Sequence, residues 1–253
     1  MLGLGGLGGA IARGLAAAGS DIELAVCDRH PEKRAGFVRA FADASEAVAG
    51  ADAVVLAVKP KHIAGLAHAI EPNVGADALL ISCAAGIAAQ AIGRPGRAVA
   101  RVMPSIGAAV GASVTAAFYG EHCVPERDRP RLLLVFGRLG EVREVPDENW
   151  LHAAAALTAS APAWLLLCVE ALVDGGVEAG LPRADALAFA RGALAAGAAR
   201  LVDGVEPVSL RGAVTSPGGT TAAGIAALES RGVRAGFLDA VRAAVARSRA
   251  LGS

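Results

Sequence analysis

The chain has 253 residues, of which 54% are apolar, and its 24 basic side chains balance its 24 acidic ones. This length exceeds one typical hydrophobic core, and the apolar content is sufficient for two modest domains. Because the formal net charge is zero, no chain-wide field attracts nucleic acid or an anionic membrane, so we expect neither as a partner.

Cysteine spacing and the opening residues indicate a cytoplasmic protein. The four cysteines, which are Cys27, Cys83, Cys123 and Cys168, lie far apart and lack the spacing of a metal site. Three of them stand in apolar runs, where small buried residues belong. We therefore expect reduced, structural thiols and no bound metal. We also expect no targeting segment, because the first basic residue, Arg13, follows the glycine-rich opening and no signal core precedes a cleavage site.

The glycines at the start of the chain predict a nucleotide-binding turn. Gly3, Gly5 and Gly8 have the spacing G-x-G-x-x-G and lead directly into a helical pattern. The first glycine permits a tight turn, the second lets phosphates approach the backbone, and the third lets helix and sheet pack closely. We expect Gly6 and Leu7, which stand inside the motif, to contact the cofactor as well.

A short apolar run that ends in Asp28 reads as the next strand, at about the spacing at which dinucleotide folds bind the adenine ribose. Asp28 favours the free ribose hydroxyls of NADH, whereas Arg29 and Lys33 suit the additional phosphate of NADPH. A solvated turn is an equally good interpretation of Arg29. The sequence therefore leaves NADPH or NADH open as the cofactor.

The stretch before the glycine motif is shorter than a dinucleotide-binding fold requires. A dinucleotide fold has a central strand of roughly five residues before the first motif glycine, yet Met1 and Leu2 alone precede Gly3. We therefore expect a truncated first strand, whose neighbours would be left with unpaired backbone groups. The stretch between Pro31 and Phe41 is also short for a helix plus a strand.

Short apolar runs alternate with helical patches through the first half of the chain. This rhythm predicts an α/β fold with a Rossmann-type parallel sheet. The expected strands lie at 53–58, 78–82, 98–102 and 112–118. Together with the segment 125–145 they form a dinucleotide-binding domain over residues 1–146.

From residue 147 the chain changes to long Ala/Leu-rich helices, which predict an all-helical substrate and dimerisation domain over 147–253. Its most apolar segment, 153–173, is interrupted by Thr158, Ser160 and Pro162, so a buried helical hairpin describes it better than a membrane span. Such charge-poor helices expose too much apolar surface for one thin domain, so we expect a dimer.

Loops with small side chains follow the predicted strands. In an open α/β sheet the ligand lies outside the carboxyl ends of the strands. We therefore expect the nicotinamide half of the cofactor to contact Ala57, Val58, Lys59, Pro60 and Ala84. A strand end followed by a solvated lysine is the alternative interpretation of Lys59.

A second ligand-binding turn is predicted near the end of the chain, directly before the amphipathic stretch 222–230. Proline fixes one backbone angle, glycines let a ligand approach main-chain N–H groups, and a helix start contributes unpaired donors. A small anion suits such a turn, although an ordinary loop has the same composition. The expected substrate-binding residues are Ser216, Pro217, Gly218, Gly219, Thr220 and Thr221.

The chain resembles the pyrroline-5-carboxylate reductase family over nearly its whole length. The resemblance rests on the glycine motif and on the segments 56–60, 82–87, 101–104, 157–164 and 210–221. It implies NAD(P)H-dependent reduction of 1-pyrroline-5-carboxylate to L-proline, and a helical domain that is interleaved between two subunits, which often form larger rings of dimers. It also implies that the substrate carboxylate lies on the backbone of 216–220 and that Thr221 is the catalytic residue, bonded to the ring nitrogen.

Three alternatives remain at this point. A non-catalytic, regulatory dinucleotide-binding homolog fits the short first strand and the altered loops, in which Ser105 replaces the usual asparagine and Ala159 and Ala161 replace glycines. A reductase of another small cyclic imine fits the same motifs. A β-hydroxyacid dehydrogenase is disfavoured, because that chemistry uses a lysine in the first interdomain helix and residues 151–169 contain none.

Overall fold

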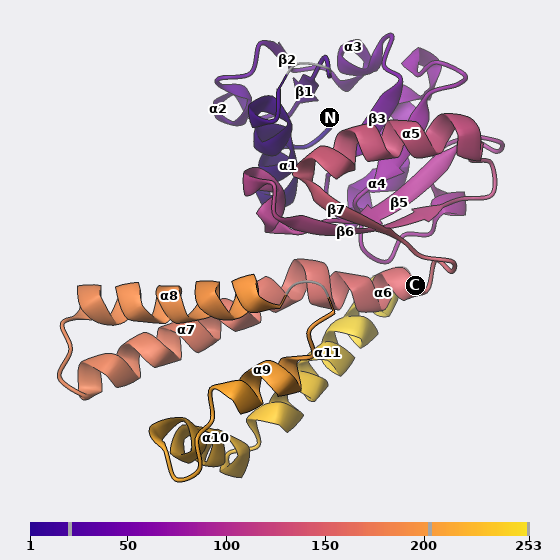
Figure 1. The fold of residues 1–253 in the computed structure, drawn as a ribbon. Coiled ribbons are helices and arrows are strands. Elements are labelled where there is room, and N and C mark those ends of the chain that lie inside the picture. Colours follow the sequence, from indigo (N-terminus) through magenta and orange to yellow (C-terminus); the bar gives the residue numbers. More distant parts are fainter. Residues whose placement is uncertain (20–21, 202–203, 252–253) are drawn as a thin grey trace. The chain divides into compact units, whose positions relative to one another are not determined.

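The computed structural model describes residues 1–19, 22–201 and 204–251, which divide into two compact units (Figure 1). Unit 1 comprises Met1–Pro162 and Ala243–Ser253, and unit 2 comprises Ala163–Arg242. The division falls after Pro162 instead of after residue 146, because the helix Trp150–Ala155 contacts the sheet and Ser248, near the end of the chain, bonds to His152 of that helix.

Unit 1 alternates strands and helices, as expected of a dinucleotide-binding domain. Its strands are β1 (Ala25–Cys27), β2 (Arg39–Phe41), β3 (Ala53–Leu56), β4 (Leu79–Ser82), β5 (Val99–Met103), β6 (Ser113–Tyr119) and β7 (Gly140–Glu144). Its helices are α1 (Gly6–Ala17), α2 (Pro31–Arg34), α3 (Ala44–Val48), α4 (Pro60–Ile70), α5 (Pro125–Phe136) and α6 (Trp150–Ala155). The strands expected from the four apolar runs are confirmed as β3 to β6, and the short α2 and β2 account for the abbreviated stretch after Pro31.

The sheet is parallel apart from one pairing. β1 pairs with β2, and the other strands follow the order β3-β4-β5-β6-β7. β6 runs antiparallel to β5, with Phe118 beside Arg101. A parallel crossover needs a dozen or more residues, and the connection between these two strands, which contains the 3₁₀ turn Ile106–Val110, is shorter than that. The chain therefore reverses direction at this point.

Met1 to Gly3 take the place of the central strand. The N–H of Leu2 donates to the carbonyl of Val55 at 2.8 Å, and the N–H of Gly3 donates to the carbonyl of Cys27 at 2.8 Å. Leu2 thereby forms parallel bridges to both β1 and β3. These residues thereby join the two halves of the sheet.

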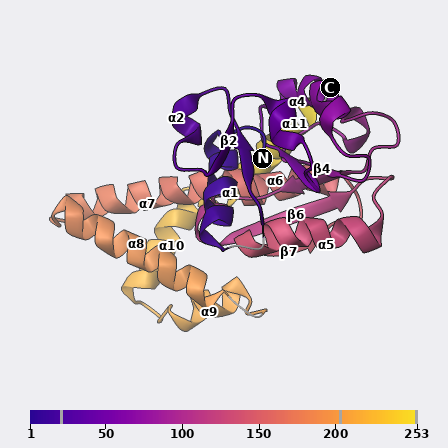
Figure 2. The ribbon, with the colours of Figure 1, turned by 90° about the horizontal axis from the view of Figure 1, so that it is seen from above.

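The sheet has helices on both of its faces, with α4 on one and α5 on the other (Figure 2). The side chains of the strands alternate between two hydrophobic layers, one on each face. Val55 and Ile81 pack with α1 and α5 on one face. Val54 and Leu80 pack with α3 and α4 on the other. Successive side chains of a strand thus point to opposite faces, and both faces of the sheet are buried. The carboxyl ends of the strands remain free for ligand-binding loops.

Unit 2 is helical, as predicted. Its helices are α7 (Ala161–Glu178), α8 (Arg183–Arg200), α9 (Pro207–Ala213), α10 (Thr220–Ser230) and α11 (Val233–Ala250), of which α7 begins and α11 ends in unit 1. α7 and α8 form a hairpin around Val173, Ala186 and Ala190. The expectation that the apolar hairpin is buried is wrong for the single chain, because leucines such as Leu166 and Leu172 are more than half exposed.

One continuous helical stretch among the described residues, Trp150–Glu178, is long and apolar enough to cross a membrane, and 17% of its most apolar window is buried. It consists of α6, a π-helical turn at Ala156–Ser160 and α7. Length and composition alone are weak evidence for a membrane span, because interface helices of other proteins share them.

Candidate active site

The glycine motif forms a tight turn between the central strand and α1. Gly3 has a φ of +92°, which other residues rarely adopt, and a Cβ there would lie 2.9 Å from the carbonyl oxygen of Ala57. A Cβ on Gly8 would lie 2.1 Å from the carbonyl oxygen of Gly3. These two glycines are therefore required by the close approach of α1, its preceding turn and the end of β3.

The remaining motif glycines face open space. A Cβ on Gly5 or on Gly6 would meet no atom within 4 Å. Gly5 caps α1, whose first turn holds no acidic side chain, so its first N–H groups are available to an anion. This bare helix start fits the pyrophosphate of a dinucleotide, and Leu7, in the same turn, is partly exposed.

Asp28 ties the glycine turn to the end of β1. Its Oδ2 accepts the N–H of Leu4 at 2.7 Å, and its Oδ1 accepts the N–H of His30 at 2.9 Å. Burial alone would raise the pKa of Asp28, but these two hydrogen bonds and the charge of Lys33 together lower it below its usual value. The carboxylate is thus ionised and fixed beside the position expected for the adenine ribose.

Two basic residues expected at the cofactor lie on the same turn. Arg29 is exposed and donates from Nε to Nε2 of His30 at 3.0 Å. Nζ of Lys33 lies 4.0 Å from Oδ1 of Asp28. An acceptor for ribose hydroxyls and donors for a ribose phosphate are thus present together, which suits either NADPH or NADH.

The loops after β3 and β4 stand at the carboxyl edge of the sheet. Ala57 donates its N–H to the carbonyl of Leu2, Lys59 caps α4, and Pro60 is the first residue of that helix. Val58 packs against the glycine turn, where its Cγ1 would lie 2.8 Å from a Cβ on Gly3. These four residues therefore lie next to the mouth of the predicted phosphate site.

Ala84, in contrast, is 2% exposed. Its N–H donates to Oγ of Ser82 at 3.2 Å, and its carbonyl accepts a bond from Nη2 of Arg101 at 3.0 Å. Ala84 thus forms the buried base of its loop, and the partly exposed Ala85 and Gly86 form the surface that a cofactor would contact.

Two further residues, Glu148 and Thr158, support the carboxyl edge of the sheet, and the sequence did not indicate this role for either of them. Glu148 pairs with Arg101, and Thr158, in the π-helical turn, donates from Oγ1 to the carbonyl of Met103 at 3.0 Å. A sequence signal existed for Arg101, because it is a charged residue inside an otherwise apolar strand. Glu148 and Thr158 carry no such signal, since their partners are distant in the chain.

The predicted substrate residues of unit 2 lie together in one turn at the start of α10. Gly218 has a φ of +69°, and Gly219 caps the helix and donates its N–H to the carbonyl of Ser216 at 3.1 Å. A Cβ on Gly219 would lie 2.4 Å from Oγ of Ser216. The backbone of Gly219 and the hydroxyl of Ser216 therefore lie close together, so a larger residue at position 219 would displace that hydroxyl.

The same turn offers free donors to solvent. The N–H groups of Thr220 and Thr221, in the first turn of α10, have no intrahelical acceptor, and no acidic side chain stands there. Ser216, Pro217 and both threonines are exposed. The turn therefore offers backbone donors at a helix start together with three hydroxyls. Such a site can bind a ligand that has a carboxylate and a second polar atom beside it.

No group of three or more His, Cys, Asp and Glu side chains converges in a way that could hold a metal ion within residues 1–19, 22–201 and 204–251. All four cysteines are free. Burial raises the pKa of the Cys83 thiol to about 12, so this thiol, which lies closest to the β4 loop, is not ionised at neutral pH.

Comparisons with known proteins match both halves of the chain. The family described as pyrroline-5-carboxylate reductase dimerisation matches residues 148–251, and the family described as NADP oxidoreductase coenzyme F420-dependent matches residues 1–86. The second match covers the glycine turn, and the first covers the turn at the start of α10.

Whole-chain relatives agree with these matches. A pyrroline-5-carboxylate reductase from Synechocystis is 40% identical over 85% of this chain and 80% of its own length. One from Thermus thermophilus is 37% identical over 99% of this chain and 97% of its own length. The crystal structure of the Plasmodium falciparum pyrroline carboxylate reductase with NADP bound has a TM-score of 0.89 at 26% identity, covering 100% of this chain and 97% of that one. The chain therefore belongs to the pyrroline-5-carboxylate reductase family.

Proposed function

We propose that the protein reduces 1-pyrroline-5-carboxylate to L-proline, the last step of proline biosynthesis, with NADPH or NADH as the reductant. The turn at Ser216–Thr221 carries the proposal, because it offers donors for a small carboxylate in a chain that also holds a dinucleotide turn. Relatives that match over nearly the whole chain bear this reductase name. Nothing in the comparisons supports a non-catalytic homolog.

The reaction needs little acid–base machinery. A cyclic imine is basic enough to arrive at least partly protonated on nitrogen, so the carbon of the C=N bond is already activated. A bound nicotinamide cofactor supplies the hydride for that carbon. The new C–H bond forms as the π electrons of the C=N bond move to nitrogen, which keeps its proton. The protein's task is to align the two reactants.

The turn at the start of α10 aligns the imine. Its carboxylate is held by the free main-chain N–H groups between Ser216 and Thr220, which exclude Pro217, because it has no N–H, and Gly219, because its N–H bonds to Ser216. The positive end of the helix dipole lies behind them. The Thr221 hydroxyl bonds to the ring nitrogen and thereby orients the C=N carbon. A hydroxyl whose pKa lies far above neutrality is a poor bulk acid, so Thr221 orients the ring or relays a proton and does not titrate.

The glycine turn aligns the reductant. Gly5 and Gly6 leave room for the pyrophosphate at the start of α1, and Asp28, Arg29 and Lys33 meet the adenine ribose. The nicotinamide half then extends to the carboxyl ends of β3 and β4, along residues 57–60 and 84–86.

An absorbance assay tests the proposal. Purified protein is mixed with NADPH or NADH and 1-pyrroline-5-carboxylate, and the loss of nicotinamide absorbance is followed together with the formation of proline. A smaller or larger cyclic imine carboxylate, offered in the same assay, tests the alternative substrate. Cofactor binding without turnover on any of these imines would favour the non-catalytic alternative instead.

We also propose that unit 2 joins two copies of this chain. Its helices expose many large apolar side chains, and the matching family is described as a dimerisation domain. α10 and α11 enclose an apolar groove of about 450 Å³, lined by Ile225, Leu228, Val233, Phe237, Leu238 and Val241. Apolar surface of this extent is typical of an interface between subunits, and a second copy of the same helices is the occupant.

A cytoplasmic location fits the same proposal. Free cysteines, two of them buried, suit a reducing compartment. The apolar stretch Trp150–Glu178 lies inside the segment that matches the dimerisation family, so contact with a second subunit explains its composition without a membrane.

A further inference from the structure

A buried ion pair connects the sheet to the loop after β4. Arg101 on β5 lies beside Ser82 on β4, and its side chain is 2% exposed. Nη2 donates to the carbonyl of Ala84 at 3.0 Å, and Nη1 donates to Oε1 of Glu148 at 3.0 Å. A charged side chain from the sheet thus reaches the backbone of the loop and a carboxylate that stands just before α6.

Glu148 holds a second point of the same loop. Its Oε1 also accepts the N–H of Ala89 at 2.7 Å. Ala84 and Ala89 delimit the first part of the β4–β5 connection, which starts at the carboxyl end of β4. The pair of Arg101 and Glu148 therefore fixes this segment at both ends, through one carbonyl and one amide.

Stability alone is a weak reason to bury such a pair. Nε of Arg101 is also buried and has no partner among the described residues, so Nη1 and Nη2 make the bonds that offset the cost of burying the charge. Apolar residues of similar volume often stabilise a fold as well as a buried ion pair does. What apolar residues cannot do is hold a backbone carbonyl and a backbone amide at defined positions.

We propose that Arg101 and Glu148 are positioning residues for the cofactor, which hold residues 84–89 so that Ala85 and Gly86 present their backbone to the nicotinamide half. This inference rests on the proposed function, which places the nicotinamide at the carboxyl ends of β3 and β4. Arg101 is buried and acts through the loop, without contact with a reacting atom.

Two probes separate loop positioning from general damage to the fold. Whole NADPH reaches the β4 loop, whereas adenosine 2′,5′-bisphosphate reaches the start of α1 and the end of β1 and no further. We expect Glu148→Ala to raise the Kd of NADPH about tenfold or more, since small misplacements at a site have effects of this size. The Kd of the bisphosphate should be nearly unchanged. Glu148→Gln keeps an acceptor oxygen and should give an intermediate loss of NADPH affinity.

A second ion pair in the same unit provides the matched control. Arg97 is 1% exposed at the side chain and pairs with Glu71 through Nη2 and Oε1 at 2.5 Å, before β5 begins and therefore at the opposite edge of the sheet. Glu71→Ala breaks this buried pair, together with the more exposed one between Glu71 and Nε of Arg94 at 2.8 Å. We expect it to lower the free energy of unfolding to a similar degree and to leave both Kd values unchanged.

The outcomes separate the two proposals. Equal losses of NADPH affinity in Glu148→Ala and Glu71→Ala, or equal losses for both probes in Glu148→Ala, would overturn the positioning role. If the unaltered protein binds neither these probes nor NADH, the proposed function fails instead; if it binds NADH alone, NADH and AMP replace the two probes. Should Glu148→Ala not fold, Glu148→Gln and Glu71→Gln give the same comparison.

Discussion

Leu4 donates its N–H to Oδ2 of Asp28 at 2.7 Å, and this bond ties the glycine turn to the end of β1. The other oxygen of Asp28 accepts the N–H of His30. Asp28→Ala leaves both amides without an acceptor, so we expect it to lower the free energy of unfolding by about 1–3 kcal/mol. Urea denaturation measures this change. Because the turn loosens, the Kd of NADPH and that of NADH should both rise.

Asp28→Asn is the control for this prediction. Its amide oxygen still accepts the N–H of Leu4, so most of the stability should return. If Asp28→Asn instead weakens NADH and strengthens NADPH, ribose recognition and not the tie to Leu4 is the main task of this residue.

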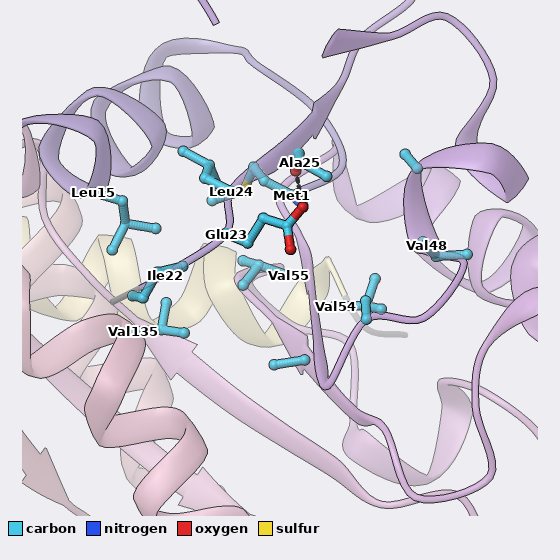
Figure 3. Close-up of a pocket in the computed structure, with 13 residues that line it drawn as sticks. Met1, Leu15, Ile22, Glu23, Leu24, Ala25, Val48, Val54, Val55 and Val135 are labelled. Carbon is cyan, nitrogen blue, oxygen red and sulfur yellow. Dashed lines mark hydrogen bonds between the residues drawn. The ribbon is translucent and has the colours of Figure 1, made fainter. Parts of the chain in front are cut away.

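The amino group of Met1 predicts a specific dependence of stability on pH. It lies buried against apolar side chains and donates to the carbonyl of Ala25 at 2.8 Å (Figure 3). Burial lowers its pKa from 8.0 to about 6. Between these values the unfolded chain binds a proton that the folded chain does not, so the free energy of unfolding falls as the pH falls from 8.0 to about 6. The loss is roughly 2–3 kcal/mol.

Urea denaturation across this pH range measures the effect. A variant with a serine added ahead of Met1 moves the ammonium group away from its buried position and should lose most of this dependence. A slope that is equal in both proteins would assign the effect to another group, such as His152, whose pKa burial also lowers.

The space ahead of Met1 predicts that added strand residues stabilise the fold. A cavity of about 70 Å³ opens there, lined by Leu15, Ile22, Val54, Val55 and Val135 among others (Figure 3). Met1 and Leu2 alternate their backbone hydrogen bonds between β1 and β3. If added residues continue this alternation, the N–H groups of Ala25 and Val55 face the added strand and can donate to it.

A variant extended by Val-Ile-Ala-Val should therefore have a free energy of unfolding about 3 kcal/mol higher, since two of its side chains become buried. An extension of Gly-Ser-Gly-Ser has the same length and offers no apolar side chain. Equal stability of the two extended proteins would show that the gap does not accept a strand.

Local patterns explain what the sequence predicts correctly. The glycine turn, the strands β3 to β6 and the start of α10 are each encoded within about a dozen residues, by spacing, apolar runs and turn chemistry. The antiparallel direction of β6 follows from the shortness of its connection to β5. The pairing of Arg101 with Glu148 depends on tertiary packing between residues 47 positions apart, for which no local pattern exists.

The apolar pattern of α7 also did not determine whether its side chains are buried within the single chain. The leucines of α7 have the same composition whether their partner is the same chain or another one, so an apolar run predicts burial without saying against what. Similarly, the acid at the end of β1 is typical of ribose recognition, but its hydrogen bonds to Leu4 and His30 depend on the folded turn.

The apolar groove of unit 2 predicts the effect of a charge on self-association. Phe237 and Leu238 line it and are 38% and 53% exposed in the single chain. If a second copy covers the groove, Phe237→Glu replaces an apolar contact at the interface by a buried carboxylate, and sedimentation should show mainly monomer. Val38, which is fully exposed on unit 1, provides the control: Val38→Glu should leave the oligomer intact. A monomer in the unaltered protein would contradict the proposed dimer.

Thr221 tests the proposed chemistry most directly. It stands in the first turn of α10, exposed, with its hydroxyl available to a ring nitrogen. Thr221→Val keeps the shape and removes the hydrogen bond to a group that carries charge, which is worth about 1.5–3 kcal/mol and predicts a fall in kcat of about tenfold to a hundredfold. The Kd of NADPH should not change, because the glycine turn holds the cofactor. Thr221→Ser restores the hydroxyl and should recover most of the rate. If Thr221→Val retains the full kcat, the ring nitrogen has another partner, and Thr221 is not the catalytic residue.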